Sequence, residues 1–436
     1  MLNHIRECGM GSRTGTLTDG EVERVIDGLM VQLPPARRVL LVPPDITRCY
    51  SYAGFITASL YRRLSDSARV EIMPAVGTHR PMSREEQINF FGGNIPEQAF
   101  LHHDWRSETV RLGTVPGSYV REVTGGRCSQ GVPVEVNRSL VDGTYDLIFS
   151  IGQVVPHEVV GMANYSKNIL VGLGGRRMIN ESHMIGAVCG LETIMGNVDT
   201  PVRKLFDYAE EMFLKDVPLA YILTVTTCEN GRTLVHGVYG GASRRVFEEA
   251  ADLAQIWNVT EVPARMKKVV AYLEPGEFSS TWVGNKSVYR TRMMIEDGGE
   301  LLVIAPGLRH FGENPEVDGL IRRYGYRGTP YTMKLVEQGA FAGADMVPAH
   351  MIHSSSEDRF TITYAVDPAN MTREEIEGVG YRYMDVSRAL ARYPVDRLAE
   401  GRQVMPDGEE IYLVKAPALG LWRSRRWGGG GNENNS

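Results

Sequence analysis

Short apolar runs alternate with amphipathic stretches along the first part of the chain. Apolar residues dominate the runs at 38–42, 69–76 and 146–151, and the stretches between them at 53–64 and 84–91 have apolar residues at a helical spacing. The short runs predict buried strands, and the spaced stretches predict helices. Because alternating strands and helices are typical of βαβ units, we expect a parallel sheet.

Further elements of the same kind follow. A helix is predicted at 200–213, where Thr200 can serve as the N-cap and Pro201 suits the first turn. A strand is predicted at 219–227 and another helix at 243–256. These elements extend the same α/β domain.

A second series of strand-like runs follows a short, polar, Pro-containing connection at 259–266. A chain of 436 residues exceeds what one core usually holds. We therefore predict an α/β fold of two domains with largely parallel sheets. The second series lies at 267–273, 301–305, 346–352 and 361–366, and the predicted bounds are 1–258 and 267–427, followed by a disordered tail at 428–436.

Charge and composition exclude several classes of protein. The formal net charge of −6 disfavours a nucleic-acid-binding protein, which usually has a basic face. No apolar run is long enough to cross a bilayer, and the N-terminus lacks the apolar segment of a secretory signal. Five scattered cysteines without a CxxC pair argue against a structural zinc site and fit a reducing compartment. We expect a cytoplasmic protein without nucleic-acid or membrane partners.

Polar residues follow each of the first three predicted strands. Asp45 and Arg48 come after the first, His79 after the second and His157 after the third. Ligands of open α/β sheets bind beyond the carboxyl ends of the strands, so these three loops point to one crevice. The guanidinium of Arg48 suits a carboxylate or a phosphate. A turn in which Asp45 caps the next helix is an equal alternative.

The two histidines suggest acid and base chemistry. His79 precedes a predicted helix whose capping box is Ser83 and Glu86, and His157 comes from a separate strand end. Two such imidazoles can stand on opposite faces of a substrate carbon, which is the geometry that a racemase needs. For either residue alone, a capping or core histidine is the plainer interpretation. The cluster at 102–104 is a rival pair, for which a structural role is favoured.

A Gly-rich stretch contains His157, Lys167 and His183. The lysine follows the first histidine by ten positions, and the second histidine follows the lysine by sixteen, in a predicted loop of small residues. A lysine can link covalently to a cofactor. One histidine rarely holds a metal alone, and no HxH, HExxH or cysteine cluster is present to complete a site. By spacing alone, the stretch predicts cofactor handling but no metal centre.

Two later segments offer groups for an anionic, hydroxylated ligand. Lys286 and Arg290 lie near Trp282 and could clamp an anion, although a charged helix face is the alternative. The segment 350–357 contains His353 among serines and suits a polyol, although serines that cap a helix are the alternative.

The pattern of these residues resembles the nickel-dependent lactate racemase family. The resemblance spans most of the chain and rests on Asp45-x-Thr47-Arg48, Gly77-x-His79-Arg80-Pro81 and the block His157, Lys167 and His183, with order and spacing kept. The family cofactor is a nickel-pincer nucleotide, pyridinium-3,5-bisthiocarboxylic acid mononucleotide, whose ring carbon and two sulfurs bind nickel. Those donors would let one protein histidine complete the metal site. The resemblance also implies that the N-terminal domain binds the cofactor and is catalytic, and that the C-terminal domain closes the active-site cleft over it.

The resemblance also implies a role for each matching residue. His79 and His157 would be the paired acid and base, and Arg48 would hold the substrate carboxylate together with Lys286. Lys167 would anchor the cofactor, either through a thioamide bond or noncovalently, and His183 would bind nickel. Asp45, Thr47 and Asn164 are further predicted contacts to the cofactor. Arg290 and His353, from the two later segments, are further predicted contacts to the substrate.

The implied activity is inversion at C2 of a 2-hydroxy acid by reversible hydride transfer to the pincer ring. The run 163–166 before Lys167 departs from the Ser-Gly-Gly run of the family, and 282–285 lacks its Tyr-Gln pair. With the polar segment 350–357, these changes favour a sugar acid, an aldonate such as gluconate, over lactate. The alternatives are a short or aromatic 2-hydroxy acid, a metal-dependent sugar-acid dehydratase, and a protein that binds the cofactor without catalysis. Enzymes of cofactor synthesis are expected partners.

Overall fold

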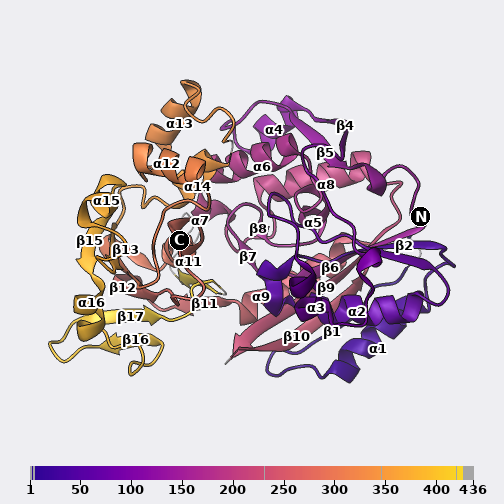
Figure 1. Ribbon diagram of the computed structural model, residues 1–436, viewed down its shortest axis with the longest axis horizontal. Helices are drawn as coiled ribbons and strands as arrows, with labels where there is room; N and C mark the ends of the chain where they lie inside the picture. Colours follow the sequence, from indigo (N-terminus) through magenta and orange to yellow (C-terminus); the bar gives the residue numbers. More distant parts are fainter. Residues whose placement is uncertain (1, 3–4, 230, 345, 419, 426–436) are drawn as a thin grey trace, which may run out of the picture. The chain divides into compact units, whose positions relative to one another are not determined.

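The structure is a computed structural model that describes residues 2, 5–229, 231–344, 346–418 and 420–425 (Figure 1). The chain forms two compact units, unit 1 with Met1–Ile185 and Ile194–Asn258, and unit 2 with Gly186–Thr193 and Val259–Ser436. Each unit contains a six-stranded, mostly parallel sheet, which confirms the predicted α/β class. The predicted tail at 428–436 lies outside the described residues, and the cleft between domains stays a prediction.

The sheet of unit 1 has the strand order β1-β10-β9-β6-β2-β3. The four strands from β9 to β3 are parallel, whereas β10 and β1 are antiparallel to their neighbours. The three strands predicted from the first apolar runs are therefore adjacent. The bounds are β1 Cys8–Gly11, β2 Arg38–Val42, β3 Arg69–Ile72, β6 Leu147–Gln153, β9 Leu219–Glu229 and β10 Arg232–Gly241.

Helices cover both faces of this sheet. Helices α1 and α2 lie on one side, and α5 and α8 lie on the other (Figure 1). The predicted capping box of α3 is confirmed, because Ser83 and Glu86 each bond the other's backbone N–H. The bounds are α1 Asp19–Met30, η1 Ile46–Ser51, α2 Ala53–Leu64, α3 Arg84–Phe91, η2 Glu97–Ala99, α4 Gly117–Val123, η3 Arg138–Leu140, α5 Ser166–Leu170, α6 Arg176–Cys189, α7 Leu191–Ile194, α8 Pro201–Phe213 and α9 Arg244–Trp257.

Two small antiparallel ribbons complete unit 1. One pairs β4 Thr109–Val115 with β5 Val132–Asn137. The other pairs β7 Pro156–His157 with β8 Gly161–Met162, so a tight hairpin carries His157.

The sheet of unit 2 has the order β15-β14-β13-β12-β17-β16, and only β16 is antiparallel to its neighbour. The expected connection at 259–266 contains strand β11, which pairs in parallel with β18. The strand bounds are β11 Val259–Val262, β12 Met266–Tyr272, β13 Ile295–Ala305, β14 Thr361–Val366, β15 Arg382–Asp385, β16 Gly401–Val404, β17 Glu410–Val414 and β18 Leu421–Ser424. The helix bounds are α10 Thr281–Gly284, α11 Lys286–Thr291, α12 Pro315–Tyr324, α13 Thr329–Glu337, α14 Val347–His353, α15 Arg373–Gly378 and α16 Val386–Arg392.

One predicted strand of unit 2 is wrong. The run at 346–352 forms helix α14, with Pro348 in its first turn. A short apolar run cannot be assigned by periodicity alone, and a proline at this place favours a helix start.

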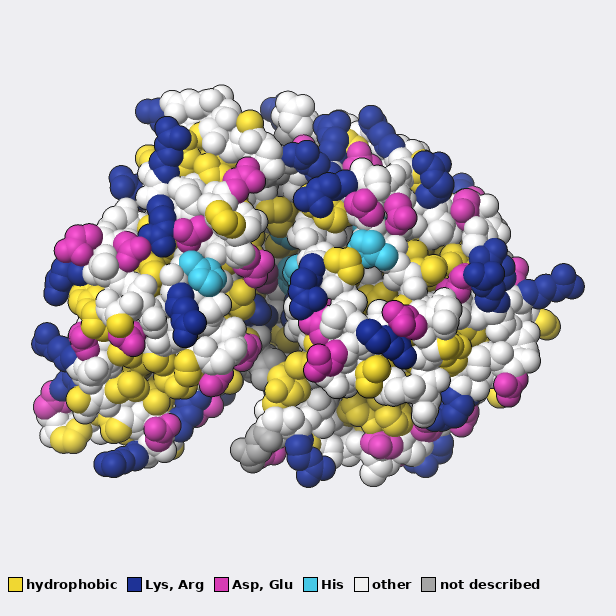
Figure 2. Space-filling model, in the orientation of Figure 1, with side chains coloured by type: hydrophobic (Ala, Val, Ile, Leu, Met, Phe, Trp, Pro, Cys, Tyr) yellow, Lys and Arg dark blue, Asp and Glu magenta, His cyan; other side chains and the backbone are white. Residues whose placement is uncertain are grey.

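Across the described residues, no helix is both long and apolar enough to span a membrane. Basic and acidic side chains are interspersed on the face shown in Figure 2.

Candidate functional site

Asp45 and His79 form a hydrogen-bonded pair beyond the ends of β2 and β3. The two strands stay in register past their ends through a bridge between Pro44 and Ala75. His79 Nδ1 lies 2.7 Å from Asp45 Oδ2, while Thr47 donates its N–H and hydroxyl to Asp45 Oδ1. Burial acts to raise the pKa of Asp45, but the bonds from His79 and Thr47 outweigh it and lower that pKa. Asp45 is therefore a carboxylate that orients His79 with Nδ1–H toward it and Nε2 as the acceptor.

His157 is held in the opposite tautomer. Its Nδ1 accepts the N–H of Val159 at 3.1 Å, so the ring proton resides on Nε2. The side chain is only 6% exposed. Burial, followed by the charges of Lys167 and Arg48, lowers its pKa well below the usual value, although the carboxylate of Glu158 acts against the shift. His157 is thus a neutral imidazole with Nε2–H as its donor.

Lys167 lies in the first turn of α5, near the carboxyl end of β6. Burial first, and the positive charge of Arg48 second, lower the pKa of its amine to about 8, while Glu158 acts against this shift. A substantial fraction of the amine is therefore neutral near physiological pH, as a nucleophile requires.

His183 lies on helix α6, and the loop predicted there is wrong. The polar residues at 180–183 interrupt the apolar pattern in the sequence, so the helix was not predicted. In the structure, buried residues follow a helical spacing: Met178, Ile179, Ser182 and Ile185. The helix lets His183 Nδ1–H donate to the carbonyl of Ile179 at 2.6 Å, which leaves the Nε2 lone pair available. Burial first, and the charge of Lys167 second, lower its pKa to about 4, so the ring is neutral and able to bind a metal.

These side chains of unit 1 gather into one site. The positive charge of Arg48 lowers the pKa of both His157 and Lys167. Lys167 in turn lowers the pKa of His157 and His183, and Asp45 acts to raise that of Lys167. Among the described residues, no group of three or more His, Cys, Asp or Glu side chains could hold a metal ion. A metal at His183 would therefore need its other donors from a bound molecule, as the pincer cofactor supplies.

The remaining predicted site residues of unit 1 form hydrogen bonds to neighbouring residues of the protein. Thr47 is exposed and donates to Asp45. Asn164 is buried at φ 62°, and its side-chain oxygen accepts the N–H of Tyr165 at 2.8 Å. The rival His103 is buried between Asn137 and the carbonyl of Gly174, which supports its structural interpretation. The cofactor contacts of Thr47 and Asn164 stay predictions.

The other predicted substrate residues belong to unit 2. Lys286 lies half-buried at the start of α11, and its charge acts on Glu277. Arg290 is buried and donates to the carbonyl of Gly420 at 2.8 Å. His353 is buried at the end of α14, with its ring edge-on to another aromatic ring of α11. Their contacts with substrate stay predictions.

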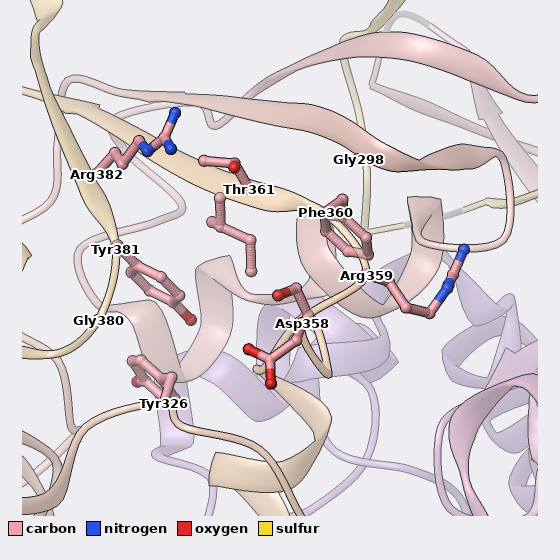
Figure 3. A pocket seen from close by; sticks show the side chains of 11 residues that line it. Gly298, Tyr326, Asp358, Arg359, Phe360, Thr361, Gly380, Tyr381 and Arg382 are labelled. Atoms are coloured by element: carbon pink, nitrogen blue, oxygen red, sulfur yellow. The ribbon is translucent and has the colours of Figure 1, made fainter.

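Unit 2 has a pocket of about 330 Å³ at the edge of its sheet where the parallel strands begin (Figure 3). Thr361 and Arg382, the first residues of β14 and β15, line it, so it opens at the amino ends of parallel strands. Figure 3 shows Arg359 pointing away from Tyr326, and this arginine bonds Asp297 at 2.9 Å. Ligands of such sheets bind at the carboxyl ends, so this pocket is not the candidate site.

Two further residues of the site did not emerge from the sequence. Glu158 acts electrostatically on His157, Lys167 and His183, and its place directly after His157 was the available signal. Arg203 is fully buried and bonds the turn before Lys167. Its signal was a helical position shared with apolar Val202 and Phe206 of α8.

Replacing Asp45 with asparagine is expected to lower turnover by about 10–100-fold, the range typical for a partner that orients a functional group. The amide keeps the size of the carboxylate but removes the charge that fixes His79 Nδ1–H. Steady-state kinetics of cofactor-loaded protein would measure the change. Asp142→Asn is the control, because Asp142 is exposed and accepts the N–H of Thr144, and this change should alter turnover by less than about threefold. Equal effects of both variants would contradict an orienting role for Asp45.

Comparison with known proteins relates this site to one family. A family model described as the lactate racemase N-terminal domain matches residues 27–193. A curated lactate racemase from Lactiplantibacillus plantarum is 25% identical over 233 residues, which are 52% of this chain and 49% of the relative. Another from Thermoanaerobacterium thermosaccharolyticum is 27% identical over 207 residues, 47% of this chain and 44% of the relative. The matched part spans about half the length of these relatives.

Two solved structures share the fold. A protein from Thermotoga maritima superposes with a TM-score of 0.79 at 24% identity and covers 95% of this chain and 100% of its own. The lactate racemase apoprotein from Thermoanaerobacterium thermosaccharolyticum has a TM-score of 0.68 at 18% identity and covers 89% of this chain and 87% of its own.

The fold and the site define an α/β protein whose N-terminal half contains a lactate racemase N-terminal domain. The domain match, the two curated relatives and the shared fold agree with one another. Residues 27–193 are thus similar to the N-terminal domain of lactate racemases, and the chain shares its fold with a lactate racemase apoprotein.

Proposed function

We propose that this protein is a 2-hydroxy-acid racemase or epimerase that uses a nickel-pincer nucleotide. The observation that carries the proposal is the gathering, in unit 1, of two histidines in opposite tautomers beside a lysine of lowered pKa and one metal-competent histidine. Each of these four features suits a separate part of the reaction.

The two tautomers suit proton transfer at the substrate hydroxyl. His79 presents an unprotonated Nε2 while its Nδ1–H faces Asp45, so it can accept the hydroxyl proton, and Asp45 stabilises the cation that forms. His157 presents Nε2–H and can donate a hydrogen bond to the oxygen from the other side. Inversion requires groups on both sides of the carbon, because the product has the opposite hand.

Arg48 would bind the carboxylate of the substrate. It lies in the turn between β2 and α2, and its positive charge acts on both His157 and Lys167. A guanidinium can donate two parallel hydrogen bonds to a carboxylate and so fix the C2 carbon. Lys286 of unit 2 would supply the second cationic contact.

Lys167 and His183 fit the two attachments of the cofactor. When bound, the nickel-pincer nucleotide would supply a hydride acceptor at C2 and return the hydride to either face. The partly neutral amine of Lys167 suits a thioamide bond. The Nε2 of His183 suits nickel, because the bond from Nδ1–H to a backbone carbonyl fixes that tautomer.

We propose an aldonate such as gluconate as the substrate. The segment 350–357 offers hydroxyls and imidazoles, and Ser356 in it is half-buried. Ser354 and Ser355 are buried, and Ser355 donates to Glu357 at 2.6 Å, so these two hydroxyls are already used within unit 2. The sugar-acid assignment therefore rests on fewer groups than the racemase chemistry does.

The function can be tested with protein from a cofactor-producing host. Gluconate and lactate are incubated separately in normal and deuterated water, and the C2 epimers are quantified. The expected result is the C2 epimer of gluconate with its C2 hydrogen retained, because a transferred hydride does not exchange with solvent. Turnover of lactate alone would reject the sugar acid, deuterium at C2 would reject hydride transfer, and bound cofactor without turnover of any acid would indicate a binding protein.

A further inference from the structure

The turn directly before Lys167 has a strained backbone. Asn164 and Tyr165 have φ angles of 62° and 57°, in the left-handed region that glycine favours. This conformation is uncommon for non-glycine residues and a true outlier for a bulky one such as tyrosine. Such a turn persists only when its surroundings hold it. Because α5 begins at Ser166, any relaxation of the turn would move Lys167.

The guanidinium of Arg203 donates three hydrogen bonds to this turn and the residues beside it. Its Nη1 donates to Ser166 Oγ at 2.8 Å, and its Nη2 donates to the carbonyls of Met162 and Asn164 at 2.7 and 3.2 Å. The side chain is fully buried. Burying a cation is costly unless hydrogen bonds compensate for it. Arg203 Nε has no hydrogen-bond partner among the described residues, so the compensating bonds of the guanidinium run from Nη1 and Nη2 to the turn.

The aromatic ring of Tyr165 is held as well. Its ring centroid lies 4.4 Å from that of Tyr221 and 5.3 Å from that of Phe247. The half-buried Glu210 accepts the hydroxyl of Tyr221 at 2.7 Å and also bonds the hydroxyl of Tyr165. Backbone and side chain of the turn are thus fixed by groups on α8, α9 and β9.

The start of α8, the helix that contains Arg203, also bonds the hairpin that carries His157. Thr200, the N-cap of α8, donates its hydroxyl to the carbonyl of Val160 at 3.1 Å. Gly161 fits closely here, because a Cβ at this position would lie 2.0 Å from the carbonyl oxygen of Asn197. The start of α8 therefore contacts the backbone beside both His157 and Lys167.

We propose that Arg203 is a positioning residue for Lys167, which holds the strained turn at Asn164 and Tyr165 so that the amine of Lys167 stays within the site. Its catalytic meaning rests on the proposed function. The claim about the amine itself does not, because the reactivity of Lys167 can be measured on cofactor-free protein.

Arg203→Lys separates positioning from charge. Lysine keeps the positive charge but cannot bond Ser166 and two carbonyls with one planar fork. If Arg203 acts by position, the released turn lets Lys167 reach solvent, and its apparent pKa rises from about 8 toward the ordinary value for lysine. If Arg203 acts only by charge, Arg203→Lys leaves this pKa unchanged, and only Arg203→Gln raises it.

The measurement is the rate of Lys167 acylation by acetic anhydride against pH, followed by peptide mass spectrometry, with the unfolding midpoint recorded for each variant. We expect the apparent pKa to rise from about 8 by about one unit or more in Arg203→Lys, a roughly fivefold or greater loss of neutral amine at pH 8. Arg244→Gln is the matched control. Arg244 of α9 pairs with Asp207, which lies on α8 together with Arg203, so its replacement removes a nearby arginine and should leave the pKa of Lys167 unchanged.

Ser166→Ala keeps the test valid if Arg203→Lys fails to fold. It removes one of the three bonds of Arg203 and should shift Lys167 in the same direction by a smaller amount. A lowered unfolding midpoint without any change at Lys167, in either variant, would overturn the proposal. Absence of cofactor from the wild-type protein would contradict the proposed function but leave this result standing.

Discussion

The proposed turnover of a 2-hydroxy acid is expected to fall by about 10²–10⁴-fold when His157 is replaced with glutamine, the usual contribution of a positioned acid or base. Glutamine can keep a hydrogen bond in this buried place but cannot exchange a proton near neutral pH. The loss should appear in kcat for both directions of inversion, because each direction uses both sides of the carbon. Nickel and cofactor content should stay at the wild-type level.

His102→Gln is the matched control for that experiment. His102 is exposed and lies within the matched residues 27–193, and its charge acts on the buried His103. Its replacement should leave turnover within about twofold of wild type, the effect expected of an ordinary surface change. Normal turnover in His157→Gln would remove this residue from the reaction.

Nickel retention is expected to weaken by roughly 100-fold or more when His183 is replaced with alanine, since even the partner of a metal ligand is worth 10–100-fold in affinity. The bond of His183 Nδ1–H to the carbonyl of Ile179 leaves its Nε2 available for the proposed bond to nickel. Metal analysis after dialysis measures the loss. Turnover should fall with the metal.

Comparison with Lys167→Ala separates the two attachments of the cofactor. Intact-mass spectrometry should find the nucleotide still attached in His183→Ala but absent in Lys167→Ala if the lysine bond is covalent. Glu181→Ala, two residues away on α6, is the control and should keep both metal and nucleotide. Wild-type nickel content in His183→Ala would refute its assignment as the ligand.

The strand ends were predictable because their signal is local. An apolar run marks each of β2, β3 and β6, and polar residues directly after it mark the carboxyl edge. Strand order then follows from the parallel pairing, which brings Asp45, His79 and His157 to one edge. Family resemblance supplied what this pattern lacked, namely a division of roles and a source of metal donors.

Other features depend on contacts that no local pattern records. Helix α6 was missed because polar residues at 180–183 interrupt the apolar repeat, although their side chains leave the helical backbone intact. The interpretation of Arg290 as exposed or ligand-facing did not anticipate its bond to Gly420, which is 130 residues away. The role of Arg203 was equally hidden, because it bonds a turn some forty residues earlier in the chain.

The order β6-β2-β3 has a consequence for how such proteins diverge. Each loop of the site leaves a different strand, and sheet register holds each strand in place whatever its loop contains. Substitutions in one loop therefore need not displace the groups on the other two. The turn at 163–166 can therefore change in sequence while the histidines at the neighbouring strand ends keep their positions, so the proposed anchoring of a cofactor can evolve separately from the proposed proton transfer.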